Sequence, residues 1–331
     1  MGDPSLPLGT VIGRAYTIRS ILGAGGMGEV YSAEGPNGRE VALKVLHEKA
    51  QQDPDIVARF QRESEIAAQI KSPYVARILG AGKERTGRLW IAFERLHGEG
   101  LDARLRREQY LSFAEVAPIV DDIFQGLEAA HRAGVVHRDI KPANLFVEKL
   151  EATGGATVER TRILDFGVSK VVGQRKRAEP SLTAFDATLG SFAYMAPEQV
   201  RGSARVDARA DLYALGAVCF RCLAGRLPFE GINAVQLIAL KLDREPPTLR
   251  SVTNDEWPQA VEGFLARMMA RDRERRFTSA PEALRAWREV CDTMTGSRAQ
   301  MRRTGSISMP PPPADDDDAT VGADDDDPFA R

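Results

Sequence analysis

The chain has 331 residues, 43% of them hydrophobic, which is long enough for two domains or one large bilobal domain. Its 45 lysines and arginines nearly balance 47 aspartates and glutamates, and the formal net charge of -2 argues against a nucleic-acid binder driven by bulk charge. Three cysteines are too few for a disulfide framework. With no secretory leader and no run of about 18 apolar residues, we expect a cytoplasmic protein that does not insert into a membrane.

The first predicted region is a β-rich lobe at residues 16–96, which follows an N-terminal extension at residues 1–15. Short stretches of alternating apolar and polar residues are separated by turns, a pattern typical of strands. A helical period of apolar residues interrupts them once, at residues 54–71. The sequence therefore predicts one main helix and five antiparallel strands, at 16–25, 29–34, 41–46, 75–84 and 88–96.

The second predicted region, residues 97–292, is mainly helical. Helical periodicity indicates helices at 112–132, 207–223, 232–242, 258–270 and 279–292. Short strands are expected at 135–139, 144–148 and 161–165, and a hairpin connection with an exposed tip at 149–162. Together these patterns predict an α+β fold with a small antiparallel N-lobe and a larger helical C-lobe.

Residues 293–331 differ from the rest of the chain in composition. From residue 297 onward they contain four arginines and eight aspartates, and the aspartates form two DDDD blocks that follow PPPP. Such a segment cannot bury enough apolar surface to fold alone. We therefore expect a disordered acidic tail that is a candidate docking site for partners.

A glycine-rich turn follows the first predicted strand, with Gly23, Gly25 and Gly28 in the sequence GAGGMGEV. The same spacing occurs in dinucleotide-binding folds, where a helix must follow the glycines. Here EVYSAE, a turn and another strand follow instead. This context argues against an oxidoreductase and predicts a hairpin that folds over phosphate groups.

Lys44, at the end of VALK on the third predicted strand, is a candidate cation for these phosphates. An acidic residue on the following helix could hold its ammonium group in place. Glu63 and Glu65 are the two rivals, and two residues along a helix turn a side chain by about 200°. We favour Glu63 as the partner and expect Glu65 to face solvent.

The sequences HRDIKPAN, at residues 137–144, and DFG, which begins at Asp165, supply the groups that a phosphoryl-transfer site needs. Asp139 can orient an acceptor hydroxyl and accept its proton, while Lys141 neutralises charge on the transferring group. Asn144 and Asp165 offer the hard oxygen ligands that Mg²⁺ prefers.

With these motifs in this order, the chain resembles a eukaryotic-type (Hanks-type) serine/threonine protein kinase of the kind common in bacteria, over about Tyr16 to Val290. The resemblance implies ATP with Mg²⁺, or alternatively Mn²⁺, and proteins with Ser or Thr acceptors as substrates. It also implies that Asp139 is the catalytic base and that Lys44 and Glu63 form an ion pair.

The resemblance further implies a nucleotide pocket. Phe93 would limit its depth, and the backbone of residues 94–96 would bind adenine as a hinge. Asn144 and Asp165 would hold the metal. The residues expected to contact the nucleotide are Leu22, Gly23, Gly25, Gly28, Val30, Ala42, Lys44, Phe93, Glu94, Leu96 and Asn144.

Other residues are expected to support the site rather than to react. Glu198, which closes the APE triplet, would pair with Arg276, and Asp211 would hold the backbone of HRD. Ser191 stands where the family usually has Thr, and its hydroxyl can still bridge the base and the neighbouring lysine. The supporting residues are His137, Arg138, Phe166, Ser191, Glu198, Asp211 and Arg276.

Arg138 implies, by the same resemblance, that activity requires a phosphate on the activation segment. Thr183 is the favoured site and Thr188 the second, because a phosphate there can reach the Arg138 guanidinium bidentately. We expect autophosphorylation to supply it, through a transient homodimer.

The sequence leaves one alternative of another class open. A kinase-like scaffold could bind nucleotide without transferring phosphate and recruit partners through its acidic tail. Such pseudoenzymes normally lack the lysine, the base or the metal-binding aspartate, whereas Lys44, Asp139 and Asp165 are all present here. The sequence therefore favours an active kinase.

Overall fold

The computed structural model describes residues 6–25, 28–47, 57, 60, 64–152, 154–166, 192–202, 206–231 and 233–296. The chain divides into two compact units, Met1–Arg298 and Ala299–Arg331, and every described residue belongs to the first. Most of the predicted acidic tail lies outside the described residues, so its disorder stays a prediction.

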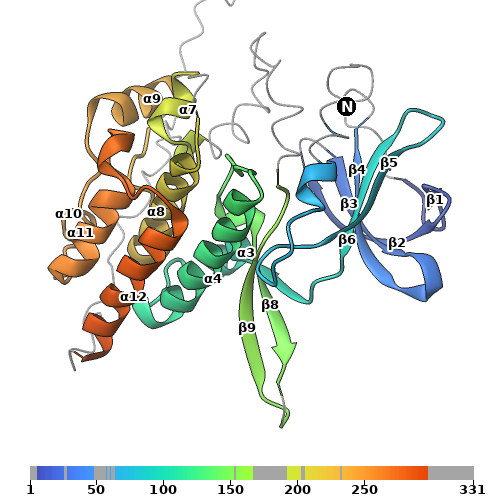
Figure 1. Cartoon of the computed structure of the whole chain (residues 1–331), viewed down its shortest axis with the longest axis horizontal. Coiled ribbons are helices and arrows are strands. Elements are labelled where there is room, and N and C mark those ends of the chain that lie inside the picture. Colours follow the sequence, from blue (N-terminus) through green and yellow to red (C-terminus); the bar gives the residue numbers. More distant parts are fainter. Residues whose placement is uncertain are drawn as a thin grey trace, which may run out of the picture. The chain divides into compact units, whose positions relative to one another are not determined.

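The N-lobe contains one antiparallel sheet with the strand order β1-β2-β3-β4-β6-β5 (Figure 1). Its strands are β1 (Val11–Ile12), β2 (Tyr16–Gly25), β3 (Gly28–Glu34), β4 (Glu40–Leu46), β5 (Ile78–Lys83) and β6 (Leu89–Glu94). Five of them match the predicted strands. The predicted number is wrong by one, because β1 comes from the expected extension and pairs with β2.

The N-terminal segment joins the sheet because it helps to cover the outer face. Trp90 on β6 lies against Gly82 of β5, where a Cβ would come within 2.8 Å of the indole ring. Ile12 is fully buried in the same apolar cluster as Trp90. Leu6 N–H donates to the Tyr31 hydroxyl at 2.9 Å, which holds the start of the segment. The segment is therefore part of the N-lobe core.

A second apolar cluster joins β6 to the N-lobe helix. Val57 and Phe60 are helical and buried, and they cluster with Ile91 of β6. The helix was predicted to reach residue 71, but it ends at Ala67. There the Ile70 N–H donates to the Ala67 carbonyl at 3.1 Å, and this tight turn buries Ile70.

All five predicted helices of the C-lobe form, and three shorter ones, at 101–108, 197–200 and 249–253, were not predicted. None of the helices among the described residues is long and apolar enough to cross a membrane. The helices described in this lobe are α3 (Leu101–Glu108), α4 (Phe113–Arg132), α7 (Pro197–Val200), α8 (Arg209–Ala224), α9 (Ala234–Asp243), α10 (Leu249–Thr253), α11 (Gln259–Met268) and α12 (Ala280–Gly296).

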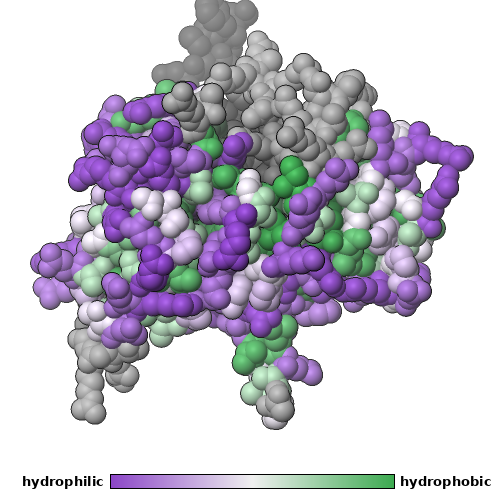
Figure 2. Space-filling model, viewed as in Figure 1, coloured by the Kyte–Doolittle hydropathy of each residue, from purple (hydrophilic) through white to green (hydrophobic). Residues whose placement is uncertain are grey.

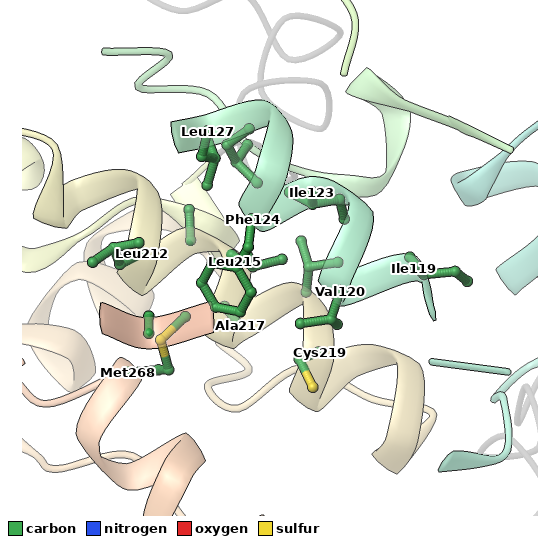
Figure 3. Packing of buried hydrophobic residues seen from close by; sticks show 14 of the residues in the cluster. Ile119, Val120, Ile123, Phe124, Leu127, Leu212, Leu215, Ala217, Cys219 and Met268 are labelled. Carbon is green, nitrogen blue, oxygen red and sulfur yellow. The ribbon is translucent and has the colours of Figure 1, made fainter. Parts of the chain in front are cut away.

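The helix α8 lies in the middle of the C-lobe core. Of its 16 residues 14 are buried, as expected for a helix that other elements surround. Phe124 of α4 packs beside Leu215 of α8, and Met268 of α11 belongs to the same cluster (Figure 3). A helix packed on several sides has little freedom to move, so it is a rigid base for the residues attached to it.

A hairpin of β8 (Leu145–Glu151) and β9 (Thr157–Ile163) projects from the C-lobe, as the sequence predicted (Figure 1). With β7 (Gly98–Gly100) it forms a three-stranded antiparallel sheet. The base of the hairpin is buried, whereas Val158 near the tip is 47% exposed. Figure 2 shows apolar residues at the surface of this hairpin, while hydrophilic residues cover much of the visible face of the C-lobe.

Residues 135–139 were expected to form a strand, and this prediction is wrong because they run as a loop. The N–H groups of His137 and Arg138 donate to the carboxylate of Asp211 on α8 rather than to a neighbouring strand. Arg138 also has a φ of 65°, in the left-handed region that interrupts a strand. The loop therefore takes its shape from α8.

Candidate active site

The loop that carries Asp139 is held by one buried carboxylate. Asp211 is 0% exposed and accepts hydrogen bonds from His137 N at 2.9 Å and Arg138 N at 2.7 Å. Its Oδ2 also lies 2.8 Å from Nε2 of His131 on α4. A buried carboxylate with several donors is stable only in that arrangement, so Asp211 sets the geometry of the loop.

The His137 ring connects this loop to the Asp165 segment. Its Nδ1 accepts a hydrogen bond from Asp139 N at 3.2 Å, so Nε2 carries the proton and donates to the Leu164 carbonyl at 2.8 Å. The ring also meets the Phe166 ring edge to face, with centroids 4.6 Å apart. His137 and Phe166 therefore link the loop of Asp139 to the segment of Asp165, which fits the supporting role predicted for them.

Asp139 has a cation and an amide beside its carboxylate. Lys141 Nζ lies 3.0 Å from Oδ2, and Nδ2 of Asn144 donates to the same oxygen at 3.0 Å. Within the described residues Oδ1 has no hydrogen-bond partner, so it can accept a proton from an incoming hydroxyl. The Asn144 carbonyl accepts from Leu164 N at 2.9 Å, which joins this group to the residue before Asp165.

The side chain of Lys44, on β4 of the N-lobe, contacts Asp165, which follows β9 of the C-lobe. Its Nζ lies 2.7 Å from Oδ2 of Asp165, whose backbone φ of 55° is in the left-handed region. The predicted partner Glu63 lies outside the described residues, so that ion pair stays a prediction. Glu65 is exposed, as expected for the rival residue. Lys44, Asp165 and the Asp139 loop thus form one connected group.

Strand register places the predicted nucleotide-binding side chains on one face of the sheet. Val30 lies opposite Lys44, and Ala42 lies opposite Phe93. Residues directly opposite in an antiparallel pair share a face, as do residues two apart in a strand. All four therefore lie on the face that carries Lys44. Leu22, on β2, is 39% exposed.

The predicted glycines differ in what the fold demands of them. A Cβ at Gly28 would come within 2.2 Å of the Val45 carbonyl oxygen, so the pairing of β3 with β4 requires glycine there. A Cβ at Gly23 would meet nothing within 4 Å. The fold leaves open space beside Gly23, as a phosphate-covering loop needs. Gly25 lies at the end of β2.

The hinge is tied to β9 by Arg162, which sequence reasoning missed. Arg162 is 7% exposed and forms ion pairs with Glu94 of the hinge and with Glu148 of β8, the latter at 2.8 Å. Its Nη2 also donates to the Val75 carbonyl at 3.0 Å. The available signal was weak, since Arg162 is one of three charged residues in the strand that leads to Asp165. Leu96, at the other end of the predicted hinge, is also buried.

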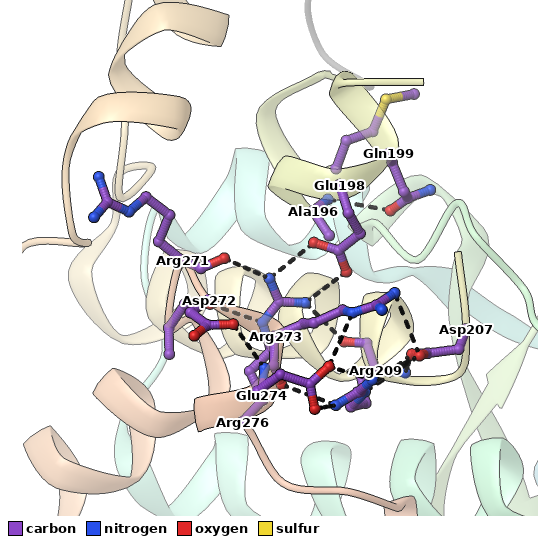
Figure 4. Close-up of polar contacts among 12 residues, drawn as sticks. Ala196, Glu198, Gln199, Asp207, Arg209, Arg271, Asp272, Arg273, Glu274 and Arg276 are labelled. Atoms are coloured by element: carbon purple, nitrogen blue, oxygen red, sulfur yellow. Dashed lines mark hydrogen bonds and ion pairs between the residues drawn. The ribbon is translucent and has the colours of Figure 1, made fainter. Parts of the chain in front are cut away.

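Glu198 and Arg276 form a double ion pair, with N to O distances of 2.7 and 2.9 Å (Figure 4). Gln199, which sequence reasoning missed, lies next in the chain. Its Oε1 accepts from Ala196 N at 3.1 Å, and its Nε2 donates to the Arg138 carbonyl at 2.8 Å. The segment that ends in APE is therefore bonded directly to the loop of the base.

The Arg138 side chain donates from Nη2 to the Val206 carbonyl at 3.4 Å. Its Nε is buried and has no hydrogen-bond partner among the described residues. Ser191, Thr183 and Thr188 all lie outside the described part of the chain, so the predictions made for them are untested.

The residues present fit a magnesium nucleotide. Because Nδ2 of Asn144 donates to Asp139, its Oδ1 is left to act as a metal ligand beside the Asp165 carboxylate. No cluster of three or more His, Cys, Asp or Glu that could hold a metal occurs in the described ranges. Mg²⁺ does not need one, since it usually takes one or two protein ligands and completes its shell with phosphate and water.

A small antiparallel lobe, a helical lobe and this connected set of Asp139, Lys141, Asn144, Asp165 and Lys44 define the protein kinase class. The chain belongs to the protein kinase family, since the model of the protein kinase domain matches residues 16–287. The predicted fold class is thereby confirmed.

The relatives are bacterial serine/threonine-protein kinases. The chain is 35% identical over 296 residues to pkn3 of Myxococcus xanthus, covering 83% of this chain and 53% of that protein. It is 39% identical over 273 residues to PknJ of Mycobacterium tuberculosis, covering 81% and 44%. The crystal structure of the PknI kinase domain of Mycobacterium tuberculosis superposes with a TM-score of 0.65 and 30% identity, covering 86% of this chain and 99% of that one. The chain spans about half the length of the curated relatives it matches.

Proposed function

We propose that this chain is a serine/threonine protein kinase that transfers the γ-phosphoryl group of ATP to Ser or Thr hydroxyls of proteins. One observation carries the proposal. The Asp139 carboxylate, held by Lys141 and Asn144, is joined through the Leu164 to Asn144 backbone bond to Asp165, which meets Lys44. Base, phosphate-binding cations and metal ligands thus belong to one group.

In the proposed reaction the acceptor oxygen forms a bond to the γ-phosphorus, and the bond from that phosphorus to the β,γ-bridging oxygen breaks. Oδ1 of Asp139 takes the hydroxyl proton, while Lys141 stabilises negative charge on the transferring group. Lys44 orients the other phosphates. Bound Mg²⁺ would neutralise charge on the phosphates, held by Asn144 and Asp165. Catalysis rests on positioning and charge more than on strong basicity.

We further propose that a phosphate on the activation segment switches the enzyme on. The buried Nε of Arg138 without a described partner supports this proposal, because a phosphate could accept its hydrogen bond. Thr183 is the preferred site and Thr188 the second. Autophosphorylation within a transient homodimer would supply the phosphate.

The boundaries of the kinase domain and of the tail are also a proposal. We place the kinase domain at residues 16–292 and the acidic tail at 293–331, and we expect the tail to dock partners without taking part in transfer. The structure adds one detail, since α12 continues to Gly296. The cytoplasmic location stays a prediction.

The test is phosphosite mapping by mass spectrometry after incubation with ATP and Mg²⁺. Asp139→Asn should lower transfer by about 100-fold or more while nucleotide affinity is kept, because only the base is removed. Asp243→Asn, on the exposed end of α9, is the matched control and should transfer normally.

Phosphate on Ser or Thr in the unmodified chain but not in Asp139→Asn would support the kinase. Nucleotide binding without transfer in both proteins would contradict it and favour the scaffold alternative. An active Asp139→Asn protein would show that the base is another group. Phosphate at neither Thr183 nor Thr188 would remove the proposed switch.

A further inference from the structure

Lys241, on α9, is a buried lysine that the proposed chemistry does not use. It is 1% exposed, and its Nζ donates to the carbonyls of Ala193 at 2.6 Å and Met195 at 2.8 Å. The ammonium also lies 5.1 Å from the centroid of the Tyr213 ring. Within the described residues its hydrogen bonds go to these two carbonyls and to no carboxylate. Two carbonyls and an aromatic face are therefore its main compensation for burial.

This arrangement costs free energy, because a buried ammonium loses its hydration. Burial, with the Arg276 guanidinium nearby, lowers the pKa of Lys241 to about 7. An apolar residue would fill the same place at lower cost, as the neighbouring Leu237 does on the same face of α9. The hydrogen bonds to the two carbonyls are what an apolar residue could not supply.

The two carbonyls belong to a segment that is bonded to the loop of the base. Gln199 accepts from Ala196 N and donates to the carbonyl of Arg138, the residue before Asp139. Lys241 therefore holds the segment at Ala193 and Met195, and Gln199 holds it at Ala196. Any shift of the segment relative to α9 would be passed to the immediate neighbourhood of Asp139.

The same segment offers side chains to a bound protein. Phe192, Ala193 and Tyr194 form one helical turn that packs against α9, and Phe192, Tyr194 and Met195 are only partly buried. The exposed parts of these three side chains, next to the base, can contact the residues that flank an acceptor hydroxyl. The exact position of the segment would then decide how well the acceptor chain fits.

We propose that Lys241 is a positioning residue for the protein substrate: by holding the carbonyls of Ala193 and Met195, it fixes segment 192–196 relative to Asp139. This inference rests on the proposed kinase function. It predicts an effect on the binding of the acceptor protein and little effect on ATP, whose predicted contacts lie on the N-lobe sheet, at the hinge, and at Asn144 and Asp165.

The experiment compares Lys241→Met, Lys241→Gln and Val261→Ala in transfer to a synthetic peptide with one threonine. Met keeps the length and removes all donors, and Gln keeps an amide donor. Val261 is fully buried on α11 and forms no hydrogen bond to residues 192–196 through its side chain, so its variant controls for lost stability. We expect KM for the peptide to rise about tenfold in Lys241→Met and less in Lys241→Gln, with KM for ATP unchanged in both.

An unchanged peptide KM in Lys241→Met would overturn the inference, as would equal changes in both KM values or the same change in Val261→Ala. Hydrogen exchange of residues 192–199, measured by mass spectrometry, needs no activity. If the unmodified chain transfers no phosphate, the proposed function fails, and exchange alone decides about Lys241. Faster exchange in Lys241→Met or, if that variant does not fold, in Lys241→Gln supports the role, and unchanged exchange in the folded variants overturns it.

Discussion

Two ion pairs of this chain have the same N to O distance, 2.7 Å. They differ in how many N–H donors of the cation form hydrogen bonds within the described residues. In the pair of Arg276 and Glu198, the arginine side chain is 0% exposed. It donates to both carboxylate oxygens and to three backbone carbonyls. In the pair of Lys44 and Asp165, the lysine makes one hydrogen bond within the described residues, and the Asp165 side chain is 24% exposed.

The difference separates a structural pair from a reactive one. Arg276 has five N–H donors and uses all five, so nothing is left for a ligand. Lys44 uses one of its three donors within the described residues, and Asp165 has oxygens that solvent, phosphate or metal can reach. Hydrogen-bonding capacity that the fold does not consume marks the place where a nucleotide can bind.

Breaking the saturated pair should have the largest effect on stability. Arg276→Met leaves Glu198 without its partner and three carbonyls without donors, so the free energy of unfolding should fall by about 3–5 kcal/mol. Urea unfolding followed by circular dichroism measures this change. The double variant Arg276→Met/Glu198→Met removes the orphaned charge and should recover part of the loss. A loss below about 1 kcal/mol in the single variant would mean that the pair is not structural.

Lys44→Met should change activity rather than stability. Removing a phosphate-binding cation is expected to lower transfer by about 100-fold or more. The free energy of unfolding should change by about 1 kcal/mol or less, since solvent can reach the Asp165 carboxylate that remains. Lys83→Met, at an exposed position of β5, is the matched control for transfer and unfolding. Unfolding of Lys44→Met under native conditions would place Lys44 among the structural residues instead.

A third case, a partly buried carboxylate with no ion pair among the described residues, should give the smallest effect. Asp122 on α4 accepts a hydrogen bond from Thr161 N at 2.7 Å, and burial raises its pKa from 3.8 to about 6. The folded protein thus binds this proton more tightly than the unfolded chain. The resulting stability is full below the unfolded pKa and is lost as pH rises through the folded one.

Asp122→Asn keeps an acceptor for Thr161 and removes the titration. Relative to the unmodified protein, the variant should therefore gain stability between about pH 4 and about pH 7, by about 1 kcal/mol or less, because solvent reaches part of the Asp122 side chain and screens the effect. Thermal unfolding at both pH values measures this difference. A constant difference across that range would show that Asp122 does not titrate in it.

Sequence reasoning predicted the fold well where the signal was local. Apolar periodicity identified five strands of the N-lobe and the longer helices of the C-lobe, because period 2 and period 3.6 appear within a few residues. It failed at 135–139, where an apolar run resembles a strand but its N–H groups bond to Asp211 from α8. It also missed β1, which pairs because the outer face of the sheet needs cover.

The sequence by itself determined the set of reactive groups and the family, since Asp139, Asn144 and Asp165 occur at characteristic spacing. Only the tertiary structure decided which residues, far apart in the sequence, form hydrogen bonds with the buried polar groups. Arg162 meets Glu94 across 68 residues, Gln199 meets Arg138 across 61, and Lys241 meets Met195 across 46. The physical reason is that a buried polar group must find a partner wherever packing places one, and no local pattern records that choice.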